Sequence, residues 1–174
     1  MKRFTNILLI VEAGTDHSAA LQRANVLARN NQAALTICTV VDAIPPDMAM
    51  SITMITPGEL RDIAVAEERD RLEEIVKTIA GDGASVGIKV LVGRASIEII
   101  RQVIGSGHDL VIKSADSATG SINRLFGSTD MKLMRKCPCP VWIVRSWMST
   151  SLSWEPLPVP ELPVFSWAIL RRPS

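Results

Sequence analysis

The sequence predicts a mostly parallel, doubly wound α/β sheet, and two observations support this prediction. Five short aliphatic runs alternate with segments whose apolar residues recur at every third or fourth position. Strands that are buried on both faces of a parallel sheet have such continuous apolar runs, whereas half-exposed strands alternate. Five strand-and-helix steps therefore indicate an open sheet with helices on both faces.

The first strand and the first helix are marked at both ends. Residues 6–11 form a continuous aliphatic run, as expected of a buried strand. Thr15 or Asp16 then suits the cap position of a helix that ends near Asn30 and Asn31. The apolar residues of this segment are Ala20, Leu21, Ala24, Leu27 and Ala28. Their spacing predicts an amphipathic helix.

The second strand leads to a long helix with a strong start signal. Residues 34–41 form a β-rich run, and Thr56 and Glu59 have the spacing of a capping box. The apolar positions that follow are Leu60, Ile63, Ala64, Leu72, Ile75, Val76 and Ile79. They predict one core face opposite a charged face, before Gly81 and Gly83 end the helix.

The remaining elements continue the same alternation. Residues 86–92 predict a third strand, and a helix is expected from there to the glycines at 105 and 107. A fourth strand begins at residues 110–112. A last helix over 128–136 leads to a fifth strand over 140–145, where proline is tolerated at the first position.

Length and composition indicate one folded domain followed by a tail. The 174 residues suit a single domain, and 47% hydrophobic with 21% charged residues is ordinary for a globular chain. From residue 146 the chain becomes rich in proline and tryptophan, and no helical or strand period continues. We expect a domain over residues 1–145 and a tail over 146–174 that is disordered alone or docked on a partner.

Charge and cysteine content exclude several classes of function. The formal net charge is +1, so no overall field attracts nucleic acid or an anionic membrane. The sequence has no run of about 18 uncharged apolar residues, as a spanning helix would need. An odd number of cysteines, three, does not suit a disulfide framework and fits a reducing compartment. We expect a cytoplasmic protein without nucleic-acid or membrane partners.

Candidate binding residues lie where the predicted strands end. In an open parallel sheet, ligands bind beyond the carboxyl ends of strands whose connections diverge. The segments at these ends are 12–16, 40–42 and 113–129. Small residues in the last segment would let the backbone approach phosphate, and the next helix start would hold an anion. A plain strand-to-helix connection with a capped helix explains the same residues, and we favour it.

Charged and nucleophilic side chains near these segments have ordinary explanations. Lys113 at a strand end would suit an acidic ligand, but an exposed strand-end lysine is the simpler expectation. Cys137 and Cys139 lack the spacing of a metal site and are expected to form a rigid turn. Neither His17 nor His108 has an apparent paired nucleophile. Because the common phosphate-loop and nucleophile motifs are also missing, we expect no enzyme, no catalytic residue and no metal site.

The sequence resembles the universal stress protein family over about residues 4–145. The most specific match is the stretch 127–144, GSTDMKLMRKCPCPVWIV, which is similar to the family's closing helix, Cys-Pro turn and last strand. Nucleotide-binding members carry Gly, two residues, Gly, nine residues, then Gly-Ser or Gly-Thr. Gly127 and Ser128 match the final pair, whereas Ser114 and Ser117 replace the earlier glycines. This departure resembles the N-terminal halves of tandem, two-domain members, which often lack the nucleotide motif.

The resemblance implies a fold and an assembly. The fold is adenine nucleotide alpha hydrolase-like, with an open parallel five-stranded sheet in the order 3-2-1-4-5. The last strand, with Val141, Ile143 and Val144, pairs with its counterpart in a homodimer, or with a second universal stress protein domain in a pseudo-dimer. Pairing also covers an apolar edge that would favour aggregation. Because no second α/β domain follows residue 146, a truncated or frame-shifted tandem protein is a further expectation.

The resemblance also implies roles for the candidate site. If a nucleotide binds, Ser128 and Thr129 contact phosphate, the Val40 backbone contacts adenine, and Glu12 lies near the base or the ribose. The other candidate residues of this site are Lys113, Ser114, Ser117 and Gly127. We predict a stress-response module that acts through dimerisation and contacts with unidentified proteins, without ATP or another cofactor. The alternative is an ATP-binding sensor with a serine-substituted phosphate loop.

Overall fold

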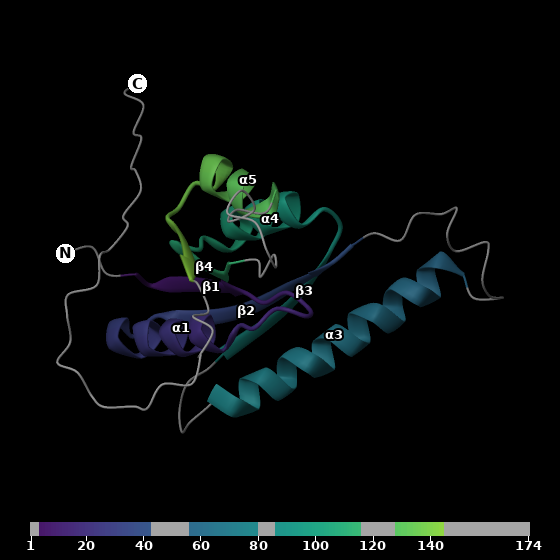
Figure 1. Ribbon diagram of the computed structural model, residues 1–174, viewed down its shortest axis with the longest axis horizontal. Coiled ribbons are helices and arrows are strands. Elements are labelled where there is room, and N and C mark those ends of the chain that lie inside the picture. Colours follow the sequence, from purple (N-terminus) through teal and green to yellow (C-terminus); the bar gives the residue numbers. More distant parts are fainter. Residues whose placement is uncertain (1–3, 43–55, 80–85, 116–127, 145–174) are drawn as a thin grey trace, which may run out of the picture.

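Five parallel strands form one sheet in a computed structural model that describes residues 4–42, 56–79, 86–115 and 128–144 (Figure 1). The strands are β1 (Asn6–Ile10), β2 (Ala34–Val41), β3 (Val86–Val92), β4 (Leu110–Ser114) and β5 (Val141–Val144). The helices of these ranges are α1 (Ser18–Asn31), α3 (Pro57–Ile79), α4 (Ala95–Ser106) and α5 (Ser128–Lys136). The strand order β3-β2-β1-β4-β5 confirms the predicted doubly wound fold.

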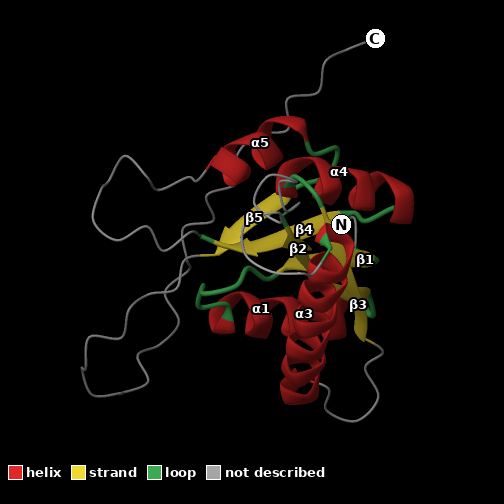
Figure 2. Cartoon of the chain, turned by 90° about the vertical axis from the view of Figure 1, so that its right-hand side faces the viewer, coloured by secondary structure: helices red, strands yellow, loops and turns green. Residues whose placement is uncertain are grey.

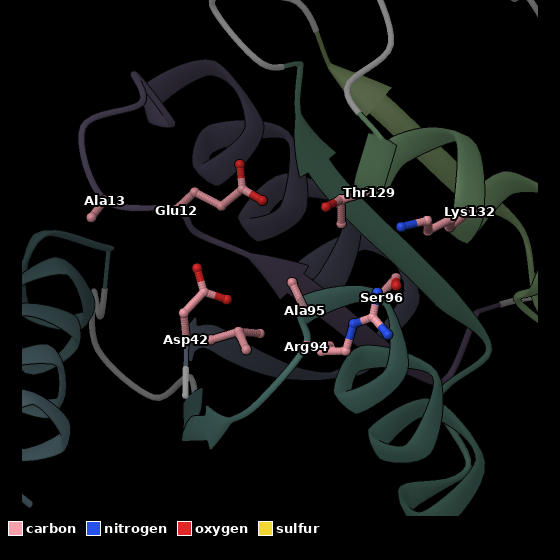
Figure 3. Close-up of a pocket in the computed structure, with 9 residues that line it drawn as sticks. Glu12, Ala13, Asp42, Arg94, Ala95, Ser96, Thr129 and Lys132 are labelled. Atoms are coloured by element: carbon pink, nitrogen blue, oxygen red, sulfur yellow. The ribbon is translucent and has the colours of Figure 1, made fainter. Parts of the chain in front are cut away.

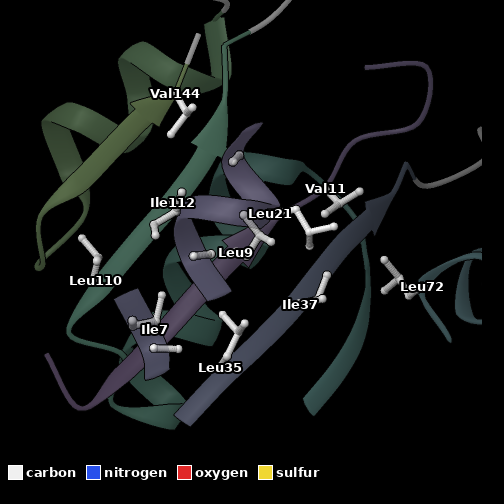
Figure 4. Packing of buried hydrophobic residues seen from close by; sticks show 13 residues of the cluster. Ile7, Leu9, Val11, Leu21, Leu35, Ile37, Leu72, Leu110, Ile112 and Val144 are labelled. Atoms are coloured by element: carbon white, nitrogen blue, oxygen red, sulfur yellow. The ribbon is translucent and has the colours of Figure 1, made fainter. Parts of the chain in front are cut away.

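The helices cover both faces of the sheet and so create two cores. Figures 1 and 2 show α1 and α3 on one face and α4 and α5 on the other. In β1, Ile7 and Leu9 belong to the core under α1 and α3, which Figure 4 shows. Leu8 and Ile10 belong to the core under α4 and α5. This division follows from the two-residue alternation of a strand, and it explains the uninterrupted apolar run.

The centre of the sheet is the point where the chain changes direction. β1 pairs with β2 on one side and with β4 on the other, so that Ile10 lies beside both Cys38 and Lys113. The connection through α1 leads from β1 to β2 on one face, whereas α4 leads to β4 on the opposite face. The carboxyl ends of β1 and β4 therefore diverge, and this is where open α/β sheets bind ligands.

Helix boundaries agree with the sequence signals at most positions. The capping box of α3 is confirmed, because the Thr56 N–H donates to Glu59 Oε2 at 2.8 Å and the Glu59 N–H donates to Thr56 Oγ1 at 3.3 Å. The first helix begins later than expected, at Ser18, whose N–H donates to Asp16 Oδ1 at 3.0 Å. Asp16 therefore still accepts a hydrogen bond from the first turn of α1, although it lies one residue before the cap residue, His17.

One predicted core position of α3 is wrong. Ile63 is 49% exposed, whereas Leu72, on the same helix, is fully buried. Figure 1 shows that the N-terminal end of α3 extends beyond the sheet, so its apolar stripe has no strand to cover there. Helical spacing defines which side of a helix is apolar, but the length of the sheet decides how much of that side is buried.

Several expectations fall on residues that the structure does not describe. They include the helix-ending Gly81 and Gly83, two candidate site residues, Ser117 and Gly127, and the tail over residues 146–174. Within the described ranges, no helix has both the length and the apolar character needed to cross a membrane.

A single carboxylate joins the amino ends of β1 and β4. Asp109 Oδ2 accepts hydrogen bonds from the Thr5 N–H at 2.7 Å and the Thr5 hydroxyl at 2.8 Å. Asp109 Oδ1 accepts one from the Asn6 N–H at 3.0 Å. Burial acts to raise the pKa of Asp109, but these hydrogen bonds outweigh it and hold the pKa below its usual range. The carboxylate therefore stabilises the strand alignment while it is ionised.

We predict that Asp109→Asn lowers the free energy of unfolding at pH 7 by about 1–2 kcal/mol, because an amide cannot accept all three hydrogen bonds. Because the pKa of Asp109 is lower in the folded protein, its stabilising contribution is complete above the unfolded-state pKa of about 3.9. This contribution is lost as the pH falls through the folded-state pKa. The difference between wild type and variant should therefore shrink on acidification. Urea unfolding at about pH 7 and pH 3 measures this, with the exposed Asp62→Asn as control. Equal stability of wild type and Asp109→Asn at pH 7 would contradict the role of Asp109 in aligning β1 and β4.

Candidate functional site

A cavity of about 450 Å³ lies at the carboxyl ends of the strands, where β1 and β4 diverge (Figure 3). The residues that line it are Glu12, Ala13, Val40, Asp42, Arg94, Ala95, Ser96, Thr129 and Lys132. They come from the ends of β1 and β2 and from the starts of α4 and α5. A volume of this size is within the usual range for small-molecule sites.

The walls of the cavity carry both signs of charge. Figure 3 shows the carboxylates of Glu12 and Asp42 pointing into the same space, while Lys132 approaches it from α5. Arg94 provides a second cationic side chain at the start of α4. A ligand here would therefore meet acidic groups on the β1 and β2 side and basic groups on the helix side.

A glycine turn brings α4 to the cavity. Gly93 has a φ of 134°, which a residue with a side chain rarely adopts, and its N–H donates to the Val41 carbonyl at 2.9 Å. A Cβ atom at this position would lie 3.2 Å from Glu98 Cγ. The turn sends the chain directly from β3 into α4, and so places Arg94 and Ser96 at the carboxyl edge of the sheet.

A buried ammonium group adjoins the cavity. The side chain of Lys113 is 1% exposed, and its Nζ lies 3.0 Å from Glu12 Oε2 and 2.9 Å from Asp130 Oδ1. Lys113 Nζ also donates to the Ser114 carbonyl at 3.2 Å. The expectation of an exposed strand-end lysine is therefore wrong. Lys113 alternates with Ile112 and faces α5, and α5 supplies the second carboxylate.

These three side chains form an ion cluster that connects distant parts of the chain. Glu12 follows β1, Lys113 belongs to β4, and Asp130 is the third residue of α5. The Asp130 side chain is fully buried and that of Glu12 is 32% exposed. A carboxylate in the first turn of a helix is also favoured by the helix dipole. With two carboxylates to one ammonium, the cluster carries a formal net negative charge.

The predicted site residues divide into three groups. Glu12, Val40 and Thr129 line the cavity, as a ligand site would require. Lys113 and Ser114 are buried beside it and do not line it. The other three are Ser117 and Gly127, which lie outside the described residues, and Ser128, which begins α5 but whose side chain is not described.

Three charged residues of the cavity or the cluster lie outside the segments that the sequence singled out, namely Arg94, Lys132 and Asp130. Arg94 follows a predicted strand, so its place at the carboxyl edge could have been inferred. Lys132 lies one helical turn after Thr129 and shares its face. Asp130 had only a weak signal, because its pairing with a lysine 17 positions earlier depends on how α5 packs on β4.

We predict that Lys113→Met destabilises the fold by about 3–5 kcal/mol, because it removes the ammonium group that the buried Asp130 faces. The double variant Lys113→Met with Asp130→Leu should recover most of this loss, since it removes charge from both positions. Denaturant unfolding measures both. Lys132→Met, a substitution of an exposed lysine on α5, is the matched control and should change stability little. A single variant as stable as the wild type would show that the cluster contributes nothing.

Comparisons with known proteins agree with the fold and with the resemblance. Residues 3–145 match the Universal stress protein family. Universal stress protein E of Escherichia coli K12 is 30% identical over 149 residues, which cover 83% of this chain and 46% of that protein. The chain therefore spans about half the length of the curated relatives it matches. Which half of a tandem protein it resembles stays a prediction.

Solved structures show the same architecture. Universal stress protein UspA from Lactobacillus plantarum superposes with a TM-score of 0.69 at 24% identity, over 83% of this chain and 100% of that chain. The universal stress protein from Archaeoglobus fulgidus in complex with dAMP gives a TM-score of 0.56 at 19% identity, over 82% and 98%. These likenesses establish the adenine nucleotide alpha hydrolase-like fold. With the match over residues 3–145, they lead to one conclusion: the chain belongs to the universal stress protein family.

Proposed function

We propose that this chain is a stress-response interaction module that pairs through β5, binds no ATP and catalyses no reaction. Membership of the universal stress protein family supports the role in stress response. The main observation against ATP binding is the Glu12–Lys113–Asp130 cluster. Its ammonium group is already paired with two carboxylates, so it is not available to a phosphate group.

The electrostatics of the site support the absence of ATP. The Lys113 ammonium already faces two carboxylates, so it offers little to a phosphate. Glu12 and Asp42 both line the cavity, and each repels a polyanion that comes within a few ångströms. Two of the motif glycines are replaced by Ser114 and Ser117, which makes a close backbone approach to phosphate harder.

The alternative function, an ATP-dependent sensor, also has support in specific observations. The cavity has a suitable volume, and Arg94 and Lys132 line it as cations. The universal stress protein from Archaeoglobus fulgidus, which has the same fold, was solved in complex with dAMP. In this alternative, Ser128 and Thr129 would contact phosphate, and the nucleotide would shift the population of conformations that partner proteins recognise.

Calorimetric titration with ATP and magnesium separates the two functions. We predict no saturable heat for the wild type, because the carboxylates repel the phosphates and Lys113 is already paired. Ser128→Trp, which would block the phosphate cradle, should then behave like the wild type. Saturable binding by the wild type that Ser128→Trp abolishes, and that the exposed Ser106→Trp retains, would contradict the proposal and establish the sensor.

The edge of the sheet supports the pairing. Within the described residues β5 has a partner strand on one side, β4, with Ile143 beside Lys113. Its four residues are all apolar, and Trp142 is 43% exposed with its ring at 5.9 Å from that of Phe4. An apolar edge strand without charged residues or proline invites another strand. Pairing with the same strand of a second copy gives a two-fold symmetric dimer, and a second universal stress protein domain gives a pseudo-dimer.

We predict that Ile143→Lys weakens the dimer at least about tenfold, which corresponds to about 1.4 kcal/mol, because it places a charge within the pairing edge. Sedimentation equilibrium over a range of concentrations measures the dissociation constant. The matched control is Ile104→Lys, since Ile104 belongs to α4 and is 67% exposed. A wild type that is monomeric throughout would contradict the homodimer, and equal weakening by both variants would contradict the role of β5.

A further inference from the structure

Two thiols face each other in the turn that joins α5 to β5. The Sγ atoms of Cys137 and Cys139 lie 3.6 Å apart, with Pro138 between the two residues. Both cysteines are half-buried, and the two prolines of the turn, Pro138 and Pro140, are exposed. Figure 1 shows this turn between α5 and β5, at the edge of the sheet. The sequence reasoning treated it as a rigid connection only.

The turn brings the two sulfurs close to bonding distance. A disulfide has an S–S length of about 2.05 Å, so the two Sγ atoms need to approach by roughly 1.5 Å. The chain bends at Pro138 and Cys139, which brings residues two positions apart closer than in a strand. The ring of Pro138 fixes its own φ, and Pro140 restricts the conformation of Cys139.

Hydrogen bonding between the thiols makes one of them reactive. Either thiol can donate the hydrogen bond between the two sulfurs. With Cys139 as the donor, this hydrogen bond, against the effect of burial, lowers the pKa of Cys137 to about 7. The Cys139 N–H adds to the same effect, while the pKa of Cys139 itself is raised, first of all by its hydrogen bond with Cys137. Since the thiolate is the nucleophile, Cys137 attacks first near neutral pH and Cys139 is the resolving thiol.

We propose that Cys137 and Cys139 form a peroxide-oxidisable dithiol, a modification site in the turn before β5. The Cys137 thiolate attacks one oxygen of hydrogen peroxide, the O–O bond breaks, and the departing hydroxide takes a proton and leaves as water. Cys137 is then a sulfenic acid, and the Cys139 sulfur attacks it, which forms the S–S bond and releases a second water. The two thiols lose two electrons and two protons, and the peroxide is reduced to two waters.

The third cysteine provides an internal control. Cys38 is fully buried in β2, and burial raises the pKa of its thiol to about 12. It lies in the core under α4 and α5, and its thiol donates a hydrogen bond to the Thr39 carbonyl at 3.5 Å. Its reaction with peroxide or with an alkylating reagent should therefore be at least about 100-fold slower than that of Cys137, since the thiolate fraction and the access are both lower.

The test is mass spectrometry of the whole chain after reaction with one to two equivalents of hydrogen peroxide. Trypsin cleavage after Lys136 and Arg145 releases both cysteines in one peptide, CPCPVWIVR. We expect this peptide to lose two hydrogens and to resist alkylation until it is reduced. In Cys139→Ser, Cys137 should stop at the sulfenic acid, which dimedone traps, whereas Cys38→Ser should oxidise like the wild type. A peptide that stays fully alkylatable, or disulfides that form between chains instead, would overturn the proposal.

Oxidation has a structural consequence next to the proposed dimer edge. The Pro140 carbonyl accepts a hydrogen bond from the Val111 N–H at 3.0 Å, and β5 begins at the next residue. A disulfide between Cys137 and Cys139 should alter the backbone at the start of β5 and so change the dimerisation. This consequence rests on the proposed pairing through β5, whereas the oxidation itself does not. Sedimentation of reduced and oxidised Cys38→Ser tests the effect. An intact disulfide peptide with unchanged dimerisation would overturn this consequence and leave the dithiol site established.

Discussion

Lys113 points from the sheet into the space under α5, where its side chain is 1% exposed. An ammonium group in such a place is costly unless opposite charges surround it, and Glu12 and Asp130 provide them. Because the three residues come from β1, β4 and α5, the requirement to pair this one charge fixes the carboxyl ends of two strands and the first turn of a helix relative to one another. Two of these segments, the end of β1 and the start of α5, also line the cavity at the diverging strands.

The cluster also gives the site its chemical character. In an open α/β sheet the position beyond the diverging strands offers backbone groups and helix starts to a ligand. Here a carboxylate of the cluster, Glu12, also lines that space, and Asp42 adds a second acidic group. The family fold is therefore retained, while the polarity beside β1 and β2 opposes phosphate. The proposed pairing surface at β5 and the proposed dithiol in the turn before it are the features through which such a module would act.

The fold could be predicted from the sequence because each element has a local signal. The long apolar runs reflect strands buried on both faces, and the Thr56–Glu59 pair marked the start of α3. The wrong prediction of a buried Ile63 shows the limit of local signals. The burial of this side chain depends on how far the sheet extends under the helix.

The site was less accessible to sequence reasoning, because it depends on contacts between separate segments. The strand alternation of Val111 and Lys113 is visible in the sequence, but the carboxylate that pairs with Lys113 follows only from the packing of α5. Similarly, the spacing of Cys137 and Cys139 is visible, whereas the contact of their sulfurs depends on the bend between them.

The most direct test of the buried ion cluster is nuclear magnetic resonance of the lysine ammonium groups in uniformly ¹⁵N-labelled protein, with Lys113→Met for assignment. A buried ammonium group held by two carboxylates should exchange its protons with water far more slowly than exposed lysines do, and should give a separate signal that the variant lacks. One slowly exchanging signal that disappears in Lys113→Met is the predicted result. If every lysine ammonium exchanges rapidly in the folded wild type, Lys113 is open to water and the cluster does not organise the site.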